Sequence, residues 1–372
     1  MQGRAVPGRY GAKRAHGTAL ALLLLVLPVA ADAGITFVSW GGAYTRSQML
    51  AYVRPFEQST GTEVEVLDYN GGLAEIRAQV RSLNVRWDVV DLEAADVVRG
   101  CEEGLLLPID PAALAPAPDG GPAAADFIEG GLLECGVGTT AWATVIAYDP
   151  RDLAPPPTTL AAFFDLQRYP GKRGLRRTPK ANLEWALLVD GVPPERVYPV
   201  LETEAGLQRA FSVLDRIKPR VVWWRSGSEA VRLLETDRVA MTTAYNGRIY
   251  DAVERRGEPY RIVWDRQIWN VNFLSIPRGT RRKQQALRFL RFATATAQLA
   301  AQADHIPYGP VRRSALARVP DTMAGQLPTA PQNREQGFRL DHDWWAQHYE
   351  RLARRFEEWL ERPVQVPRDL PH

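Results

Sequence analysis

The sequence has little cysteine and little histidine, and this scarcity limits the chemistry that it can support. Of 372 residues, two are cysteines and five are histidines. After His16, the histidines lack the i, i+4 spacing that places two metal ligands on one helical face; they are His305, His342, His348 and His372. No Gly-x-Ser-x-Gly turn of a serine hydrolase occurs either. We therefore expect no catalytic residue, no metal and no cofactor, and we predict that the chain is not an enzyme.

An excess of basic charge is missing as well. The chain has 46 Lys and Arg against 43 Asp and Glu. Residues 1–33 contain four of the basic residues and one of the acidic ones, which leaves 42 of each in the remainder. A nucleic-acid-binding protein needs a concentrated basic face that displaces counterions from phosphates. Because no long run of Lys and Arg supplies such a face, nucleic acid is not an expected partner.

The first 33 residues have the pattern of an export signal. Basic residues precede an apolar run and a small-x-small cleavage site, in the order Arg4, Arg9, Lys13, Arg14, residues 18–30 and Ala31-Asp32-Ala33. The apolar run is too short to span a bilayer, and no comparable run follows it. No cysteine stands at the cleavage site to accept a lipid. We predict cleavage near Ala33, a periplasmic location and no stable membrane insertion.

The two cysteines suit an oxidising compartment. An even pair in an exported chain is a candidate disulfide, because a periplasmic oxidase joins any pair within reach. Two buried free thiols are the alternative. A metal site is not expected from two lone thiols, since further Cys or His at ligand spacing is missing. We predict a disulfide between Cys101 and Cys135.

The hydrophobic pattern after the signal predicts alternating strands and helices. A chain of about 340 residues exceeds the size at which a single core usually stops growing, so two compact units are expected. In the first region, buried or alternating apolar runs predict strands, and i, i+3, i+4 spacing predicts helices. The expected elements are a strand at 35–39, a loop at 40–44, a helix that starts after this loop, has its apolar positions within 49–56 and ends at Gly61, a strand at 62–67, a helix over 73–83 and a strand at 89–90.

A Pro-rich stretch at residues 154–159 leads into a second region of the same character. Its expected elements are helices over 183–188, 208–217 and 282–304, strands at 239–243 and 268–277, and an amphipathic helix around 345–359. Residues 136–141 formally match a dinucleotide-binding Gly pattern. Aromatic and β-branched residues follow it, which predicts a strand and removes the helix N-terminus that would hold a pyrophosphate.

Several segments together resemble the bacterial solute-binding proteins of the spermidine/putrescine type. They are Ser39-Trp40-Gly41-Gly42, residues 56–61, Trp87-Asp88-Val89-Val90, residues 182–187, Ala244-Tyr245-Asn246-Gly247, residues 269–277 and residues 306–310. The ordered set covers nearly the whole chain after the signal. The resemblance implies a two-lobed α/β periplasmic binding protein fold of type II, in which each lobe is an open sheet flanked by helices.

In such a fold the chain crosses between lobes twice. We expect crossings near residues 142–146 and 269–273, with one lobe formed by residues 34–144 and 271–315 and the other by 145–270 and 316–372. The ligand would lie between the lobes, and closure around it would present a changed surface to the transmembrane subunits of an ABC permease. The partners implied are a small-molecule ligand and that permease, and the protein is expected to be a monomer.

The family's polyamine ligands are held by aromatic walls and carboxylates, because a ring face attracts an ammonium group and a buried ammonium needs a counter-charge. The matching positions place Trp40, Tyr44, Tyr245, Trp269 and Tyr308 among the expected ligand-binding residues. Trp224, next to Trp223, is a further candidate for the cleft.

The charged positions depart from the family pattern. Asn272 stands where polyamine binders usually have an aspartate, and Lys180 lies near a position that often holds another carboxylate. Glu93 could restore a negative charge, or it could belong with Asp91 to the solvated start of a helix. Glu184 is one residue from a usual carboxylate. Lys180 either faces solvent or faces the cleft, where it would favour a carboxylate ligand over a polyamine.

The sequence therefore leaves the ligand open. The leading hypothesis is a polyamine such as putrescine or spermidine, carried to an ABC importer. An amino acid, a carboxylate or another organic solute bound by the same two-lobed fold is the alternative. A ligand sensor for a membrane receptor is a third possibility.

Overall fold

A computed structural model describes residues 1–5, 7–8, 11 and 34–363 of the chain. The apolar run at residues 18–30 and the predicted cleavage site at Ala33 lie outside the described residues. Contacts divide the chain into residues 1–31 and residues 32–372, and every helix and strand below belongs to the second part. Among the described residues, no helix is both long and apolar enough to cross a bilayer.

Strands and helices alternate, as the hydrophobic pattern predicts. The strands are β1 (Ile35–Ser39), β2 (Val64–Asp68), β3 (Val89–Glu93), β4 (Leu132–Leu133), β5 (Gly136–Tyr148), β6 (Arg173–Arg176), β7 (Val221–Trp224), β8 (Met241–Tyr245), β9 (Arg261–Ser275), β10 (Gly309–Pro310) and β11 (Phe338–Arg339). The longer α-helices are α1 (Gly42–Gln48), α2 (Arg54–Thr60), α3 (Ala74–Arg81), α4 (Ala94–Glu102), α7 (Asn182–Val189), α9 (Glu204–Asp215), α10 (Gly227–Glu235), α11 (Asn246–Arg256), α12 (Lys283–Ala293), α13 (Thr296–Ala303) and α17 (His342–Glu361).

Shorter helical turns fill the connections. The α-helical ones are α5 (Ala123–Asp126), α6 (Leu160–Phe164), α8 (Val197–Leu201), α14 (Arg313–Leu316), α15 (Asp321–Ala324) and α16 (Pro331–Arg334). The 3₁₀ turns are η2 (Pro111–Ala113), η3 (Pro194–Arg196) and η4 (Lys218–Arg220), and η1 (Met49–Val53) is a π-helical turn between α1 and α2.

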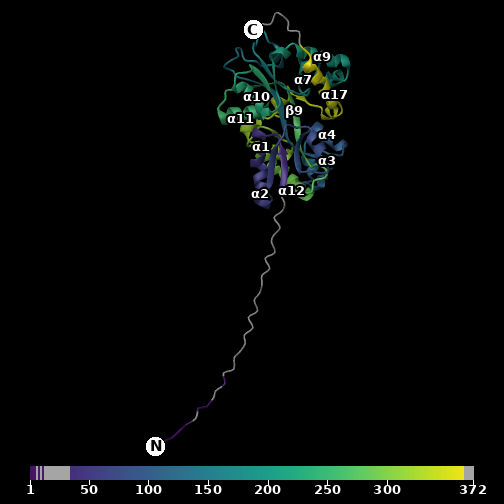
Figure 1. Ribbon diagram of the computed structural model, residues 1–372. Coiled ribbons are helices and arrows are strands. Elements are labelled where there is room, and N and C mark those ends of the chain that lie inside the picture. The colour runs from purple at the N-terminus through teal and green to yellow at the C-terminus, as the bar shows by residue number, and fades with distance from the viewer. Residues whose placement is uncertain (6, 9–10, 12–33, 364–372) are drawn as a thin grey trace. The chain divides into compact units, whose positions relative to one another are not determined.

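The strands of the described residues form one sheet, in which eight follow the order β2-β1-β3-β9-β5-β8-β6-β7; outside this order β4 and β10 pair with β5, and β11 pairs with β9. At one end β1, β2 and β3 are parallel, and at the other end β6, β7 and β8 are parallel. Between them β9 runs antiparallel to both of its neighbours, β3 and β5, and Figure 1 shows β9 in the middle of this part of the chain. Loops at the carboxyl ends of parallel strands form clefts in such sheets.

The two largest groups of buried apolar residues lie along this sheet. The larger gathers side chains from residues 35–145 and 269–311, and the second gathers side chains mainly from residues 146–217 and 338–359. Figure 1 shows α2 and α12 at one end of the sheet and α7, α9 and α17 toward the other. The chain passes from one core to the other within β5 and within β9, close to the crossings that the sequence predicts. The predicted lobe bounds stay a prediction.

One predicted helix is wrong. Residues 282–304 form two helices, because α12 ends before Thr294 and α13 begins after Ala295. Ala295 has an extended backbone, with φ −72° and ψ 155°, and Thr294 Oγ1 donates to a carbonyl one turn back. A threonine hydroxyl that bonds locally in this way competes with the helical backbone.

The first helical segment begins earlier than predicted. The sequence predicts a loop at residues 40–44 with a helix after it, whereas α1 already starts at Gly42. The segment ends at Gly61 as predicted, where φ of 71° gives the left-handed C-cap. The strand predicted after the Gly-rich residues 136–141 is present as β5, which begins at Gly136.

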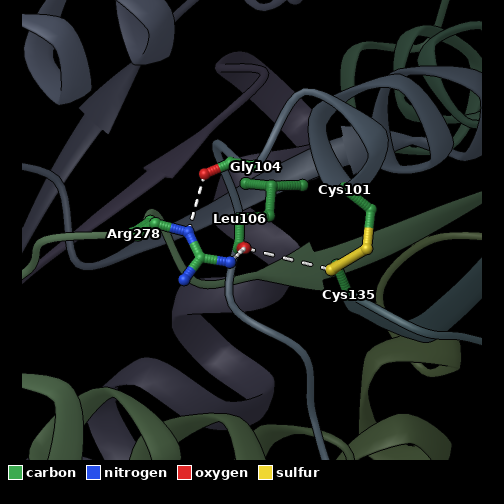
Figure 2. Close-up of a disulfide and its surroundings, with 5 residues drawn as sticks. All are labelled: Cys101, Gly104, Leu106, Cys135 and Arg278. Carbon is green, nitrogen blue, oxygen red and sulfur yellow. Dashed lines mark hydrogen bonds between the residues drawn. A yellow bond between two sulfur atoms is a disulfide. The ribbon is translucent and has the colours of Figure 1, made fainter.

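The predicted disulfide is confirmed. Cys101, in the last turn of α4, is bonded to Cys135, which directly precedes β5, with 5.6 Å between their Cα atoms. Figure 2 shows the bridge beside the turn at residues 104–106, whose carbonyls accept hydrogen bonds from the Arg278 guanidinium. The bridge therefore fixes the C-terminal end of α4 to the central strands.

Candidate ligand-binding cleft

A cavity lies where several strands end. Trp40 follows β1, Glu93 ends β3, Arg176 ends β6, Arg225 follows β7 and Tyr245 ends β8. The other lining residues are Tyr44, Asn70, Trp142, Ser226, Gly227, Arg248, Asn272 and Tyr308. Since these residues come from both of the parallel sheet ends and from both crossing strands, the cavity lies between the two apolar cores.

The turn after β1 brings an arginine against the backbone. Gly42 has φ of 57°, and a Cβ on it would lie 2.0 Å from Arg248 Nη1, so a larger residue at position 42 would displace the guanidinium. Arg248 Nη2 donates to the Trp40 carbonyl at 3.0 Å. Among the described residues, Arg248 Nε has no hydrogen-bond partner although it is buried. Arg248 therefore joins α11 to the turn and keeps one donor available.

Aromatic rings form a wall of the cavity. The rings of Tyr44 and Tyr308 lie 5.4 Å apart, and those of Trp142 and Tyr245 lie 5.0 Å apart, edge to face. Trp40 belongs to the same apolar cluster. Ring faces attract cations, most strongly where water is excluded. This wall suits the ammonium end of a ligand together with its methylene groups.

A buried carboxylate lies directly behind the wall. Asp91 accepts hydrogen bonds from Trp40 Nε1 at 2.9 Å, from Tyr44 Oη at 2.8 Å and from Gln48 Nε2 at 2.6 Å. Burial raises the pKa of Asp91 to about 7, and these three donors act in the opposite direction. Asp91 thus fixes both rings and places a negative charge behind them when it is ionised.

The side chain of Asn272 accepts a hydrogen bond from a ring of the same wall. Trp142 Nε1 donates to Asn272 Oδ1 at 2.6 Å, so the carbonyl oxygen of this side chain is already used. Asn272 lies opposite Glu93 in the pairing of β9 with β3. The position where polyamine binders usually have an aspartate therefore offers an amide and no carboxylate.

Glu93 is paired with two cations across the cleft. Its side chain is 3% exposed, and it forms ion pairs with Arg176 Nη1 at 3.1 Å and with Lys180 Nζ. Burial alone would raise the pKa of Glu93, but Lys180 and Arg176 lower it to about 2. Burial works against the charge of Lys180 too, yet Glu93 holds the pKa of this ammonium above its ordinary value.

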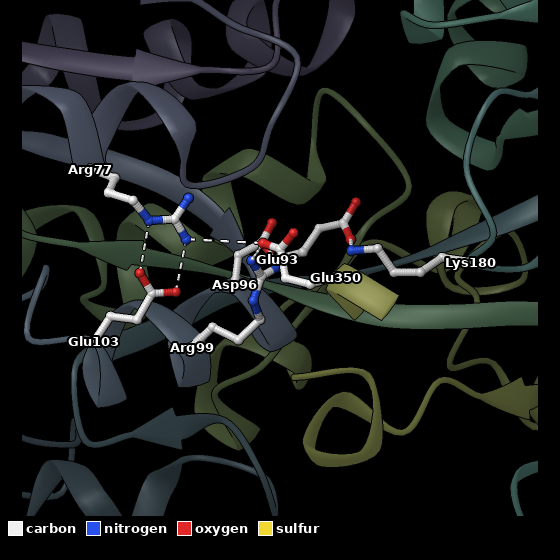
Figure 3. A network of polar contacts seen from close by, with 7 residues as sticks. All are labelled: Arg77, Glu93, Asp96, Arg99, Glu103, Lys180 and Glu350. Carbon is white, nitrogen blue, oxygen red and sulfur yellow. Dashed lines mark hydrogen bonds and ion pairs between the residues drawn. The ribbon is translucent and has the colours of Figure 1, made fainter. Parts of the chain in front are cut away.

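The ion pair continues into a polar seam between α4 and α17. Figure 3 shows Lys180 pointing toward Glu93, and Asp96, Arg99 and Glu350 beside them. Arg99 pairs with Asp96 at 3.2 Å and with Glu350 of α17. Lys180 Nζ also lies 5.0 Å from the centre of the Tyr349 ring. Lys180 is therefore buried in this seam and does not face solvent.

Two further cavities adjoin the first, and Glu93 and Arg176 line all three. One of them, called the inner chamber below, is also lined by Lys180, Thr243 and Asn270. Among the described residues, Asn270 Nδ2 and Thr243 Oγ1 are buried without a hydrogen-bond partner. The Glu93 ion pairs thus stand between the outer cavity and a chamber that contains unused polar groups.

The structure gathers six of the ten predicted site residues at the first cavity, places Lys180 at the two adjoining ones and places three elsewhere. The lining includes Trp40, Tyr44, Glu93, Tyr245, Asn272 and Tyr308. Glu184 does not line it, because its carboxylate turns toward α17 and accepts from Trp345 Nε1 at 2.6 Å. Trp269 packs in the larger core, and Trp224 is 1% exposed with its ring against Tyr245.

The arginines are what the sequence analysis missed. Arg176, Arg225 and Arg248 line the cavity, and each stands at the end of a strand or in the first turn of the helix that follows one. A usable signal was present at Arg225, since it directly precedes the capping box of Ser226 and Glu229 that begins α10. Such a helix start after a strand marks the edge of the sheet where ligands bind.

One group of residues in the described part of the chain has metal-ligand spacing, formed by Cys101, Glu134 and Cys135. The disulfide joins both sulfur atoms, so neither is a thiolate that could hold a metal.

Comparison with known proteins supports a binding role for this cleft. A sequence profile that describes bacterial extracellular solute-binding proteins matches residues 51–329. The gamma-aminobutyric acid-binding protein of Pseudomonas aeruginosa is 40% identical over 346 residues, which cover 92% of this chain and 96% of that protein.

Solved structures agree with this match. The binding protein MotA from A. tumefaciens B6, solved in complex with glucopine, has a TM-score of 0.81 and 25% identity, covering 88% of this chain and 99% of that one. An ABC transporter substrate-binding protein from Bradyrhizobium japonicum USDA 110 has a TM-score of 0.79 and 31% identity, covering 89% and 100%. The predicted binding-protein fold is confirmed.

Proposed function

The chain belongs to the bacterial extracellular solute-binding proteins, and from that premise we propose that it carries a small amino acid of the GABA class to an ABC permease. It binds a solute and is not an enzyme, as the sequence predicts. The predicted polyamine type is not supported by the comparisons, because the matched profile names no ligand and the 40% identical relative is named for gamma-aminobutyric acid. The periplasmic location, the permease and the monomeric state remain parts of this proposal.

The observation that carries the proposal is the balance of charges around the cavity. Three arginines and one glutamate line it. The glutamate, Glu93, is already paired with Arg176 and Lys180, whereas Arg248 keeps a buried donor without a partner. Leaving a buried charged donor unpaired is costly, and a ligand carboxylate removes that cost. A ligand with a carboxylate group therefore fits this cleft.

The other end of the ligand would lie against the aromatic wall. An ammonium group at the faces of Trp142, Tyr245 or Tyr308 gains a cation–π interaction, and Asp91 behind the wall supplies the negative charge. Glu93 cannot supply it as well, because two cations already neutralise its carboxylate. One ammonium and one carboxylate at opposite ends of a short chain match this arrangement.

A polyamine matches it less well. It has at least two ammonium groups and no carboxylate, so Arg225 and Arg248 would face like charge without a compensating anion. A buried like-charge contact costs several kcal/mol, which the aromatic wall, at about 1–2 kcal/mol per desolvated ring, does not offset.

The test uses three ligands with the same four-carbon chain: GABA, putrescine and butanoate. Putrescine replaces the carboxylate of GABA with an aminomethyl group, and butanoate lacks the amine. Titration calorimetry of the chain from Gly34 onward should give tight binding of GABA and weaker binding of the other two. Binding of putrescine in preference to GABA would overturn the proposal and restore the polyamine hypothesis.

Transport itself needs a separate measurement. Deletion of the encoding gene should abolish uptake of radiolabelled GABA by intact cells, and the wild-type gene should restore it. Normal uptake together with a lost transcriptional or chemotactic response to GABA would favour the sensor role instead.

A further inference from the structure

We propose that Glu93 is a built-in carboxylate that sets the specificity of the cleft: it occupies Arg176 and Lys180, so that the site accepts ligands with one carboxylate and rejects those with two. This inference rests on the proposed function and adds the residue that selects among amino acids. It predicts discrimination between GABA and glutamate, which differ by a single carboxylate.

The position of Glu93 supports this inference. It ends β3, immediately before the first turn of α4, and its carboxylate reaches across the cleft to residues that follow β6. Arg176 and Lys180 come from the opposite end of the sheet. A ligand that entered between the two ends would meet these cations at the same place. The side chain of Glu93 already fills that place.

The charged residues differ in which of the three cavities they line. Glu93 and Arg176 line the outer cavity, whereas Lys180 lines only the inner chamber and the third cavity beside it. In the inner chamber, the Lys180 ammonium and the unpartnered Asn270 amide are hydrogen-bond donors. Donors of this kind suit a carboxylate. A second ligand carboxylate would therefore be held here if Glu93 did not neutralise the cations.

The cations that Glu93 does not pair with are the ones available to a ligand carboxylate. With Arg176 engaged, Arg248 and Arg225 are the cations of the outer cavity that remain for a ligand carboxylate. They lie in α11 and directly before α10. One carboxylate satisfies them. A second one in the outer cavity would meet the negative charge of Glu93, and a buried like-charge contact of this kind is strongly unfavourable.

The test is the ratio of the dissociation constants of glutamate and GABA in the Glu93→Gln variant, measured by titration calorimetry. Glutamine keeps the shape of the side chain but releases Arg176 and Lys180. We expect the ratio of glutamate to GABA to fall by at least about tenfold relative to wild type, since freeing a buried cation changes the affinity for an anion by that order or more. The readout is this ratio and not the GABA affinity alone, because Glu93 itself lines the cavity.

A matched control is Glu103→Gln. Glu103 lies at the C-cap of the same helix, α4, where it pairs with Arg77 at 2.8 Å, away from the cavity lining. This variant removes the same charge from the protein and should leave the ratio unchanged. If it lowers the ratio as much as Glu93→Gln does, net charge and not Glu93 is responsible, and the inference is wrong.

Two further variants test the freed cations, and the second keeps the inference testable if Glu93→Gln is unstable. Adding Lys180→Met to Glu93→Gln removes one of the two freed cations and leaves Arg176, so the double variant should return part of the way toward the wild-type ratio. Lys180→Gln alone leaves the negative charge of Glu93 less neutralised. This should weaken glutamate binding further and raise the ratio of the dissociation constants of glutamate and GABA. A fall of the ratio in Lys180→Gln would contradict the inference.

The remaining outcomes separate this inference from the proposed function. If wild type binds neither GABA nor glutamate, the proposed function fails, and the specificity of Glu93 fails with it. If wild type binds GABA but Glu93→Gln leaves the ratio unchanged, only the specificity role is lost. If Glu93→Gln lowers the affinity for GABA by more than about tenfold, Glu93 contacts the ammonium group of the ligand directly. The description of Glu93 as a built-in carboxylate is then wrong.

Discussion

Replacing Arg248 tests the charge balance of the cleft most directly. Arg248 is 5% exposed, its Nε has no partner among the described residues, and its Nη2 holds the Trp40 carbonyl. In Arg248→Met the side chain keeps most of its apolar length but loses the guanidinium. A ligand carboxylate then loses at least one charge-assisted hydrogen bond, which contributes about 1.5–3 kcal/mol.

The expected loss of GABA affinity follows from that range. At about 1.4 kcal/mol per factor of ten, removal of the guanidinium should raise the dissociation constant by at least about tenfold and up to roughly 150-fold. Titration calorimetry at constant pH measures it. Arg248→Lys keeps the charge without the planar guanidinium, so its dissociation constant for GABA should lie between those of Arg248→Met and wild type.

The matched control is Arg46→Met. Arg46 forms an ion pair with Asp251, also between α1 and α11, but it does not line the cavity. Exposed ion pairs contribute about 0–1 kcal/mol, so this variant should bind GABA within about fivefold of wild type. If Arg248→Met and Arg46→Met bind GABA equally well while both remain folded, Arg248 does not hold the carboxylate, and the charge argument is refuted.

Three other measurements follow from the structure. Because the pKa of Asp91 is raised to about 7 by burial, lowering the pH through 7 should protonate this carboxyl and weaken GABA binding; Asp91→Asn should bind more weakly at high pH and lose the pH dependence, whereas an unchanged dependence would assign it to another group. Despite burial, Lys180 and Arg176 lower the pKa of Glu93 to about 2 from 4.5, so its contribution to stability is complete above pH 4.5 and is lost as the pH falls toward 2. The difference in unfolding free energy between wild type and Glu93→Gln, from urea titrations, should therefore shrink over that interval, and a constant difference would contradict the ion pairing. Replacing Cys101 and Cys135 with alanine opens a loop with a sequence separation of 34 and should cost about 4 kcal/mol in unfolding free energy, with GABA affinity largely retained; an unaltered urea midpoint would show that the bridge does not constrain the unfolded chain.

Local pattern was sufficient for much of the fold. The apolar run of β1 and the glycine at position 61 predict element boundaries that the structure reproduces, because a buried strand and a left-handed cap are set by neighbouring residues. The break at Thr294 was missed, since the apolar spacing continues across it. Periodicity records which face is buried and does not record a local hydrogen bond that interrupts the backbone.

The site was harder to predict than the fold for a different reason. The aromatic wall could be predicted because rings such as Trp40 stand in Gly-rich turns after strands. The charged residues could not, because the role of Lys180 depends on Glu93, 87 residues away in the sequence. Considered alone, Lys180 indicated a ligand carboxylate and Glu93 a ligand amine. Together they neutralise each other, which leaves Arg248 as the deciding cation.

The position of β9 has a consequence for the order in which the protein can fold. This strand, residues 261–275, lies between β3 and β5 and pairs with both. During synthesis the ribosome completes β3 and β5 long before β9 exists, so both strands have an unpaired edge until then. Contacts between residues far apart in sequence also form slowly. The nascent chain thus stays short of its native sheet until about three quarters of it has been translated, because β9, the strand that joins the two halves of the sheet, is made after all the others in the order from β2 to β7; only the two-residue strands β10 and β11 come later.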